Sequence, residues 1–320
     1  MGFRIRIVLA LATLSGVAFA QQPFPAAPIT IVVPFSAGGS ADFATRLYAD
    51  VVSRSTGYRF VIENKPGGGG VVAAMAVKAA RPDGYTLRLA DIGPDTVLPS
   101  MQPVDYDPLK NFRQITMLFS WPQFLVVPAS SPATSVAHLI ALARSKPHGL
   151  NCGTQGVGAG GDLLCAMFQM ATKAPLVRVP YKGGGPLALD LTTGRIDMAF
   201  AAYREYRAAA ADGKVRFLAV ASPHRAPVLP AVPTMAEAGL PSVELSPWFG
   251  LDAPAGTADA VITKLHDVFA AAAKNGGLAR RLTDEAIETR IDTPSEFTKF
   301  IAAERVRLGA VIEAAGIRTQ

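Results

Sequence analysis

Two glycine-rich loops contain the residues whose types and spacing could do chemistry. The candidate residues of the first loop are Phe35, Ser36, Ala37, Gly38, Gly39, Ser40 and Asp42. This loop follows a β-branched run, Ile29 to Pro34, and precedes a stretch with helical periodicity. Glycines between a strand and a helix let backbone N–H groups point at an anion, and the helix dipole favours negative charge there. The loop therefore predicts a carboxylate or phosphate site, although Asp42 by itself fits a helix cap better than a ligand contact.

The second loop follows a short predicted strand that ends at Gly153. Its candidate residues are Thr154, Gln155, Gly158, Ala159, Gly160 and Asp162. The glycines happen to satisfy the dinucleotide pattern G-x-G-x-x-G, but the next strand ends in Pro180-Tyr-Lys without an acidic residue to hold a ribose hydroxyl. We therefore expect no nucleotide and no other cofactor, and interpret the loop as a second helix N-terminus facing the first across a cleft.

Two further candidates follow other predicted strands. Asp91 comes after the strand 85–90 and is expected at the mouth of the cleft. Tyr203 follows the strand 196–200, where an aromatic side chain could cover a bound ligand. Packing is the more frequent role of such a side chain, so both interpretations of Tyr203 stay open.

The sequence has two cysteines, Cys152 and Cys165. Neither has a cluster of histidines nearby, so a zinc site of the spacing-defined kinds is not expected. If Cys152 ends a strand and Cys165 lies in the first turns of the next helix, their Cα atoms could approach bonding distance. A disulfide and a pair of buried thiols are both open.

Three common catalytic motifs are not found in the sequence. Its four histidines lie far apart, and there is no G-x-S-x-G, no H-E-x-x-H and no P-loop ending in Gly-Lys-Ser/Thr. Side chains distant in sequence can still assemble into a triad. We expect a protein that is not an enzyme.

The loops are positioned by strands that alternate with helices. Periodicity predicts strands at 29–34, 60–63, 85–90, 150–153, 176–179, 196–200 and 215–221, and helices at 42–52, 71–80, 135–145, 162–173, 186–193, 258–273, 278–282 and 294–315. This alternation predicts βαβ crossovers and an α/β fold with parallel sheets that carry helices on both faces.

Two apolar crossings predict a division into two lobes made from discontinuous sequence. The stretch 115–127 passes from one lobe to the other, and 243–251 returns. We expect one lobe from residues 25–122 plus 247–320 and a second from 123–246. A ligand would bind in the cleft between them, at the carboxyl ends of the strands.

Residues 1–20 have the pattern of a signal peptide. Arg4 and Arg6 precede an apolar run, and Ala18-Phe-Ala20 supplies the small-x-small cleavage site. Removing this segment lowers the formal net charge of +6 by two, and the remaining basic residues form no dense run, so we expect no nucleic-acid partner. No later segment reaches about 18 unbroken apolar residues. We expect a soluble protein outside the cytoplasm; a retained N-terminal anchor is the alternative.

From about Pro28 to Ile317 the chain resembles the Bug-type extracytoplasmic solute receptors of tripartite tricarboxylate transporters. The segments that carry the resemblance are Pro28 to Phe35 with Gly38, Gly39, Asp42 and Arg46, Glu63 to Gly70, Pro82 to Leu87, Tyr106 to Phe112, Val179 to Gly183, Asp190-Leu191, Gly194 to Asp197, Trp248 to Leu251 and Ala253 to Thr257.

The resemblance implies a two-lobed, type II-like periplasmic binding protein, each lobe a mainly parallel sheet flanked by helices. We also expect a monomer, exported with the leader removed after Ala20. Such a receptor closes on a small organic carboxylate or an amino-acid-like ligand and delivers it to membrane permease subunits. In such receptors the loops corresponding to Ser36–Asp42 and Thr154–Asp162 hold the ligand carboxylate through backbone amides and waters.

The sequence departs from the family at two loop positions. Ala37 stands where Pro is usual, and Asp162 stands where His is usual. Asp162 could cap the helix, repel a second acid group of the ligand, or accept an amino or amide group. Two other functions also stay open: a periplasmic sensor that presents its liganded form to a membrane kinase, and an extracytoplasmic enzyme on the same scaffold.

Overall fold

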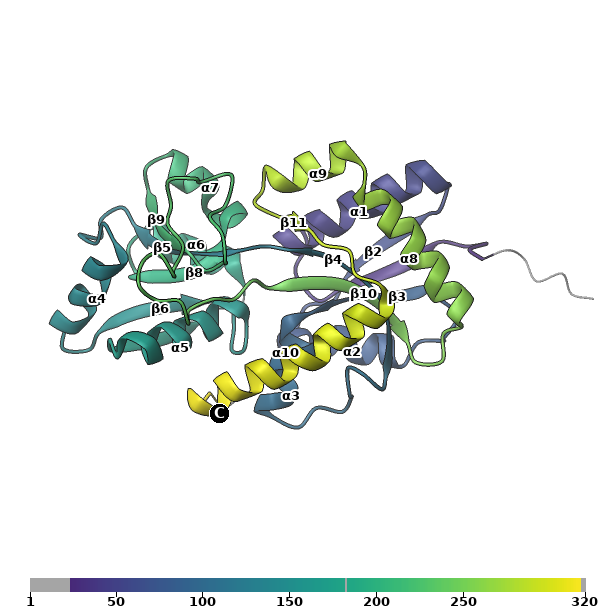
Figure 1. Ribbon diagram of the computed structural model, residues 1–320, viewed down its shortest axis with the longest axis horizontal. Coiled ribbons are helices and arrows are strands. Elements are labelled where there is room, and N and C mark those ends of the chain that lie inside the picture. The colour runs from purple at the N-terminus through teal and green to yellow at the C-terminus, as the bar shows by residue number, and fades with distance from the viewer. Residues whose placement is uncertain (1–23, 182, 318–320) are drawn as a thin grey trace, which may run out of the picture.

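The computed structural model describes residues 24–181 and 183–317 as an α/β fold built on two β-sheets (Figure 1). The first sheet has the strand order β11-β4-β10-β3-β1-β2, and the second has the order β7-β6-β8-β5-β9. The strands are β1 (Ile29–Val33), β2 (Phe60–Asn64), β3 (Thr86–Asp91), β4 (Phe112–Ser120), β5 (Gln123–Pro128), β6 (Leu150–Thr154), β7 (Leu176–Pro180), β8 (Met198–Ala202), β9 (Val215–Val220), β10 (Trp248–Pro254) and β11 (Glu288–Thr289).

Helices cover both faces of each sheet (Figure 1). Around the first sheet lie α1 (Ser40–Thr56), α2 (Val71–Lys78), α3 (Leu98–Met101), α8 (Asp259–Ala273), α9 (Gly276–Thr283) and α10 (Pro294–Ala314), with the short turns η1 (Gly68–Gly70) and η2 (Gly93–Val97). Around the second lie α4 (Val136–Ser145), α5 (Gly160–Thr172), α6 (Gly184–Thr192) and α7 (Tyr203–Ala211). We call the first sheet with its helices lobe 1 and the second sheet with its helices lobe 2.

The predicted α/β fold class is confirmed, and each sheet also contains antiparallel pairs. The βαβ units make parallel pairs, β1 with β2 and β3, and β6 with β7 and β8. By contrast, β10 runs antiparallel to β3 and β4, and β5 runs antiparallel to β8 and β9. These antiparallel strands follow the segments that carry the chain from one lobe to the other, so they enter their sheets from the opposite end.

Local sequence explains the ends of the helices that matter most. Helix α1 ends where Gly57 adopts the left-handed conformation (φ 77°) and donates its N–H to the Ser53 carbonyl. Helix α10 starts with a capping box between Thr293 and Glu296, with Pro294 in its first turn. The structure adds two helical segments that the sequence did not predict, α7 and the consecutive turns η2 and α3.

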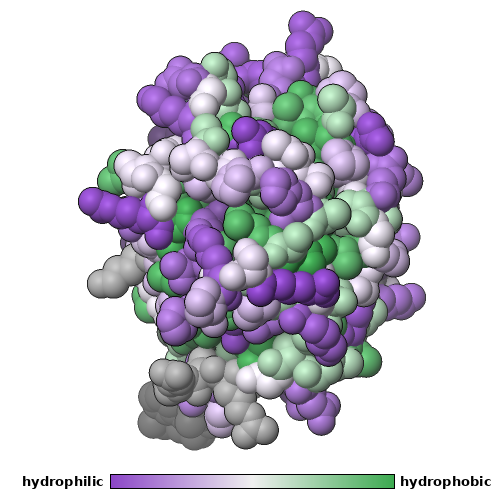
Figure 2. Space-filling view, turned by 90° about the vertical axis from the view of Figure 1, so that its left-hand side faces the viewer, coloured by the Kyte–Doolittle hydropathy of each residue, from purple (hydrophilic) through white to green (hydrophobic). Residues whose placement is uncertain are grey.

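Apolar side chains from both lobes pack into one continuous cluster. It includes Val97, Met117 and Trp248 of lobe 1 and Leu163 and Phe200 of lobe 2. Seen from the lobe 2 end, hydrophilic side chains project from most of the surface and hydrophobic ones show between them (Figure 2). The core therefore joins the two sheets, and the lobe boundaries expected at 122/123 and 246/247 stay a prediction.

The expected signal peptide, residues 1–20, lies outside the described residues. Among the helices of residues 24–181 and 183–317, none combines the length and the apolar character that a membrane crossing requires.

Candidate functional site

The carboxyl ends of the parallel strands in the two lobes lie close to one another. Helix α1 begins just after β1, and α7 begins directly after β8. Where these two helices begin, the Arg204 guanidinium of α7 lies 4.0 Å from the centre of the Phe43 ring in the first turn of α1. Arg204 and Arg207 also form ion pairs with Glu285 of lobe 1, at 2.9 and 3.0 Å. The strand ends where α/β proteins bind ligands therefore meet across the two lobes.

The first glycine loop is held by Asp42. Gly38 has a positive φ of 83°, which favours glycine, and its N–H donates to Asp42 Oδ2 at 2.9 Å. Arg46 Nε and Asn64 Nδ2 donate to the same carboxylate, at 3.0 and 2.9 Å. Burial raises the pKa of Asp42, but the hydrogen bonds from Arg46, Gly38 and Asn64 outweigh it and leave the pKa below its ordinary value. Asp42 is thus an ionised group that fixes the loop.

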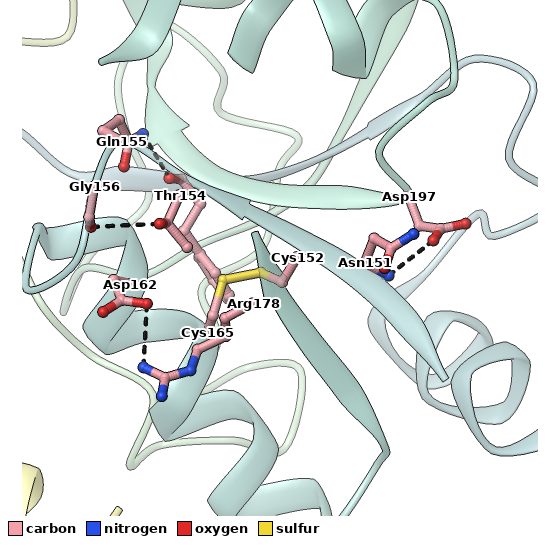
Figure 3. Close-up of a disulfide and its surroundings, with 10 residues drawn as sticks. Asn151, Cys152, Thr154, Gln155, Gly156, Asp162, Cys165, Arg178 and Asp197 are labelled. Carbon is pink, nitrogen blue, oxygen red and sulfur yellow. Dashed lines mark hydrogen bonds and ion pairs between the residues drawn. A yellow bond between two sulfur atoms is a disulfide. The ribbon is translucent and has the colours of Figure 1, made fainter. Parts of the chain in front are cut away.

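The second glycine loop repeats this geometry in lobe 2. Gly158 has a positive φ of 76°, and its N–H donates to Asp162 Oδ2 at 3.0 Å. Arg178 of β7 donates to Asp162 Oδ1 at 3.1 Å (Figure 3). The residues before the two helices, Gly39 and Ala159, both have extended backbone. Two loops from different lobes therefore present their helix N-termini in the same conformation.

Asp162 is engaged inside its own lobe. Its side chain is 5% exposed, and both of its oxygens have partners, Gly158 and Arg178. Of the three roles considered for this residue, this geometry favours a structural one near the helix start, although the bond orders the loop at Gly158 and does not cap a helical N–H. The positive charge of Arg178 also offsets the negative charge that Asp162 would otherwise direct at a ligand.

Backbone amides at both helix starts have no acceptor within their own helix. These are the N–H groups of Ser40 and Ala41 in α1 and of Gly160 and Gly161 in α5. A Cβ on Gly160 would lie 2.7 Å from Pro247 Cγ, and one on Gly161 would lie 2.6 Å from the Phe200 carbonyl oxygen. Only glycine fits at these two positions, so the second helix start depends on them.

A disulfide between Cys152 and Cys165 joins β6 to α5 (Figure 3). The two cysteines are 13 residues apart in sequence, and the segment between them contains the whole second glycine loop. Both cysteine side chains are fully buried. The structure thus has the disulfide rather than the two free thiols that the sequence also allowed.

The other predicted site residues lie near the loops in different environments. Ser36, Ala37, Gly38 and Gly39 are exposed, whereas Thr154, Gly160 and the end of β3 at Asp91 are buried. Phe35 packs its ring against Phe249, with 5.9 Å between the ring centres. The Gln155 amide donates to the Phe200 carbonyl at 2.9 Å.

Tyr203 is the first residue of α7 and packs against two phenylalanines of lobe 2. Its ring centre lies 6.1 Å from that of Phe124 and 5.8 Å from that of Phe217. The contacts of Tyr203 are those of a packing residue.

Glu205, an acidic residue just beyond the carboxyl end of β8, was not among the predicted site residues. Glu205 lies in the first turn of α7, and its Cδ would be 2.6 Å from a Cβ placed on Gly184. Its Oε2 is buried and has no hydrogen-bond partner within the described chain. Burial raises the pKa of Glu205 to about 7, which a hydrogen bond with Gln155 partly opposes. Its place after a predicted strand was the one available signal.

In the part of the chain that the structure describes, no set of side chains that could together bind a metal ion is present. There, no group of three or more His, Cys, Asp and Glu residues is arranged to hold an ion. The groups described at the facing strand ends are backbone amides, hydroxyls, carboxyl groups and the guanidinium groups of Arg204 and Arg207.

Comparisons with known proteins point to one family. A profile described as "Tripartite tricarboxylate transporter family receptor" matches residues 44–317. A protein of Agrobacterium vitis from the TAR-I ttuE-ttuC' intergenic region is 34% identical over 98% of this chain and 91% of its own length. The protein BugT of Bordetella pertussis is 32% identical over 92% of this chain and 91% of its own length.

Two solved structures are similar to this chain in both sequence and fold. Rpa4515 of R. palustris, determined with adipate, is 33% identical and superposes with a TM-score of 0.88 over 92% of this chain and 99% of its own. MatC (Rpa3494) of Rhodopseudomonas palustris, determined with bound malate, is 30% identical and has a TM-score of 0.83 over 90% of this chain and 100% of its own.

Proposed function

Because the chain belongs to the family of tripartite tricarboxylate transporter receptors, we propose that it is a periplasmic receptor that captures a small organic carboxylate between its two lobes. We further propose that it acts as a monomer, is exported with removal of residues 1–20, delivers its ligand to the membrane permease subunits of such a transporter, and catalyses no reaction.

One observation carries this proposal, the matched pair of helix starts in the two lobes. A carboxylate between α1 and α5 would accept hydrogen bonds from the amides of Ser40 and Gly160 and would lie at the positive ends of both helix dipoles. Asp42 and Asp162 already hold the loops in this conformation through Gly38 and Gly158. The ligand would therefore meet amides that need little rearrangement.

Binding by two lobes also provides a signal that a permease can recognise. A ligand that contacts α1 in lobe 1 and α5 in lobe 2 makes all its contacts only when the lobes are together, so it favours that arrangement. The permease would then distinguish the loaded receptor from the empty one by the relative position of the lobes.

The class of ligand is supported by the related structures. Rpa4515 was determined with adipate and MatC with malate, both of them dicarboxylates. We extend this class to the present chain because its two helix starts offer neutral amide donors, which suit a carboxylate.

A thermal-shift experiment tests the proposal. The mature protein is heated with adipate, malate, related mono- and dicarboxylates and amino acids, with sodium sulfate as the control for ionic strength. A ligand that binds only the folded state should raise the Tm by roughly 4 °C at about 100 times its Kd. No saturable increase with any carboxylate would contradict the proposed function.

A further inference from the structure

A buried charge network in lobe 1 joins β3, β10 and η2. Arg88 of β3 donates through Nε to Asp252 of β10 at 3.1 Å, and through Nη2 to Asp95 of η2 at 2.6 Å. All three side chains are fully buried. A third carboxyl group, that of Asp91, lies at the end of the same strand. The Arg88 guanidinium is thus bound to Asp95 and Asp252, whereas Asp91 forms no ion pair with it.

Among these three carboxyl groups, only that of Asp91 has an oxygen without a hydrogen-bond partner in the described residues. Asp91 is 4% exposed, and its Oδ1 accepts the N–H of Gly93 at 3.0 Å. Its own backbone N–H donates to Asp95 Oδ2 at 3.0 Å, so the two carboxyl groups are close neighbours. Asp91 Oδ2 is buried and has no hydrogen-bond partner in residues 24–181 and 183–317.

The surroundings of Asp91 favour its neutral form. Burial raises the pKa of Asp91 to about 8, the negative charges of Asp95 and Asp252 add to this, and the Gly93 hydrogen bond and Arg88 oppose it. Two other titratable groups act on the same cluster from outside it: Tyr106, whose hydroxyl donates to the Pro94 carbonyl, and Arg305 of α10, whose charge favours the ionised form of Asp95. A neutral carboxyl group at this position carries an O–H that needs an acceptor.

The position of Asp91 relates this group to the first glycine loop. Asp91 is paired with Phe249 across β3 and β10, so their side chains lie on the same face of the sheet. On that face the Phe249 ring contacts Phe35 of the first glycine loop. At the start of α1, above the same face, Ser40 Oγ is also buried and has no partner within the described residues.

We propose that Asp91 is a specificity-determining residue whose neutral carboxyl group donates a hydrogen bond to an oxygen of the bound carboxylate beside the first glycine loop. This inference rests on the proposed function and adds to it. An ionised Asp91 would instead repel a carboxylate and attract an ammonium group, so the protonation state of one side chain decides the class of ligand.

The test compares the wild type with Asp91→Asn and Asp91→Ala by calorimetry from pH 6 to pH 9.5. The ligand is the dicarboxylate that gives the largest thermal shift, and its carboxyl groups titrate well below the pH at which Asp91 does. Asp50→Asn, at an exposed position in α1, is the matched control. Circular dichroism at each pH checks that every variant is folded.

The wild type and Asp50→Asn should lose affinity as the pH rises through about 8, about tenfold by one pH unit above the pKa, because binding then requires the uptake of a proton. Asp91→Asn should bind with an affinity that does not show this loss, since an amide donates at every pH. Asp91→Ala should bind about tenfold more weakly than the wild type at pH 6.

Identical pH profiles for the wild type and Asp91→Asn would overturn this inference alone. An affinity that rises with pH, or a preference for a ligand with an ammonium group, would overturn it as well, because both require an ionised Asp91. Failure of the wild type to bind any carboxylate at any pH would overturn both this inference and the proposed function.

Discussion

Asp162 accepts the backbone N–H of Gly158 at 3.0 Å, four residues before it in the chain. Asp42 accepts the N–H of Gly38 in the same way at 2.9 Å. Each carboxylate also has an arginine partner, Arg178 or Arg46. The same local device therefore orders one glycine loop in each lobe.

The first prediction concerns the charge of Asp162. Because Asp162 is paired with Arg178, Asp162→Asn should change the affinity for a dicarboxylate by no more than about twofold. Asp162→Ala removes the acceptor for Gly158 and should weaken binding roughly fivefold, the equivalent of losing one hydrogen bond that orders the loop. Calorimetry on both variants checks this. A marked gain in dicarboxylate affinity for Asp162→Asn would mean that this carboxylate repels the ligand.

The second prediction concerns access to the first helix start. Gly39 has an ordinary φ of −70°, and a Cβ there would meet its nearest neighbour at 3.5 Å, so Gly39→Val should fold. Its side chain would cover the amides of α1 and should lower ligand affinity at least about tenfold. Gly276→Val, at the open start of α9, is the matched control. Equal affinities of the two variants would contradict the assignment of the site to this loop.

The third prediction concerns the disulfide. Replacing both Cys152 and Cys165 by alanine should lower the free energy of unfolding by about 3 kcal/mol, as expected for a closed loop of this size. Ligand affinity should fall too, because the bond encloses the second glycine loop. Denaturant unfolding and calorimetry measure the two effects. Reduction of the wild type should reproduce both, and unchanged affinity after reduction would show that the loop is ordered without the bond.

The fourth prediction concerns the contact between the lobes. Glu285 is 8% exposed and pairs with both Arg204 and Arg207. Since the arginines are partly exposed, Glu285→Gln should cost about 1 kcal/mol of unfolding free energy, and less at high salt. Glu237→Gln breaks an exposed pair with Arg225 inside lobe 2 and should cost less. Urea unfolding measures the loss of unfolding free energy in each variant. An equal loss in Glu285→Gln and Glu237→Gln would argue against a special role for the contact between lobes.

Much of this architecture follows from local sequence. The strand and helix patterns, the two glycine loops and the family resemblance were predicted, and the fold class and the family are confirmed. These features depend on periodicity and on turn residues, which the sequence displays directly. The mixed pairing of the sheets was not predicted, because it depends on how the crossing segments enter each sheet.

The partners of the buried acids could not be predicted. Asp162 meets Arg178 because β7 lies beside β6, with Arg178 opposite Cys152. Arg88 meets Asp252 across 164 residues of sequence, because β10 returns to lie against β3. Such pairs are set by strand order and register, and a single sequence carries no local signal for either. Helix α7 was not predicted either, although its Ala-rich second half favours a helix.

A co-crystal structure with the carboxylate that gives the largest thermal shift tests the central claim most directly. We predict that the ligand carboxylate lies between the starts of α1 and α5, within hydrogen-bond distance of amides from both lobes, among them those of Ser40 and Gly160. A ligand bound elsewhere, or held by side chains of one lobe without either glycine loop, would contradict the account.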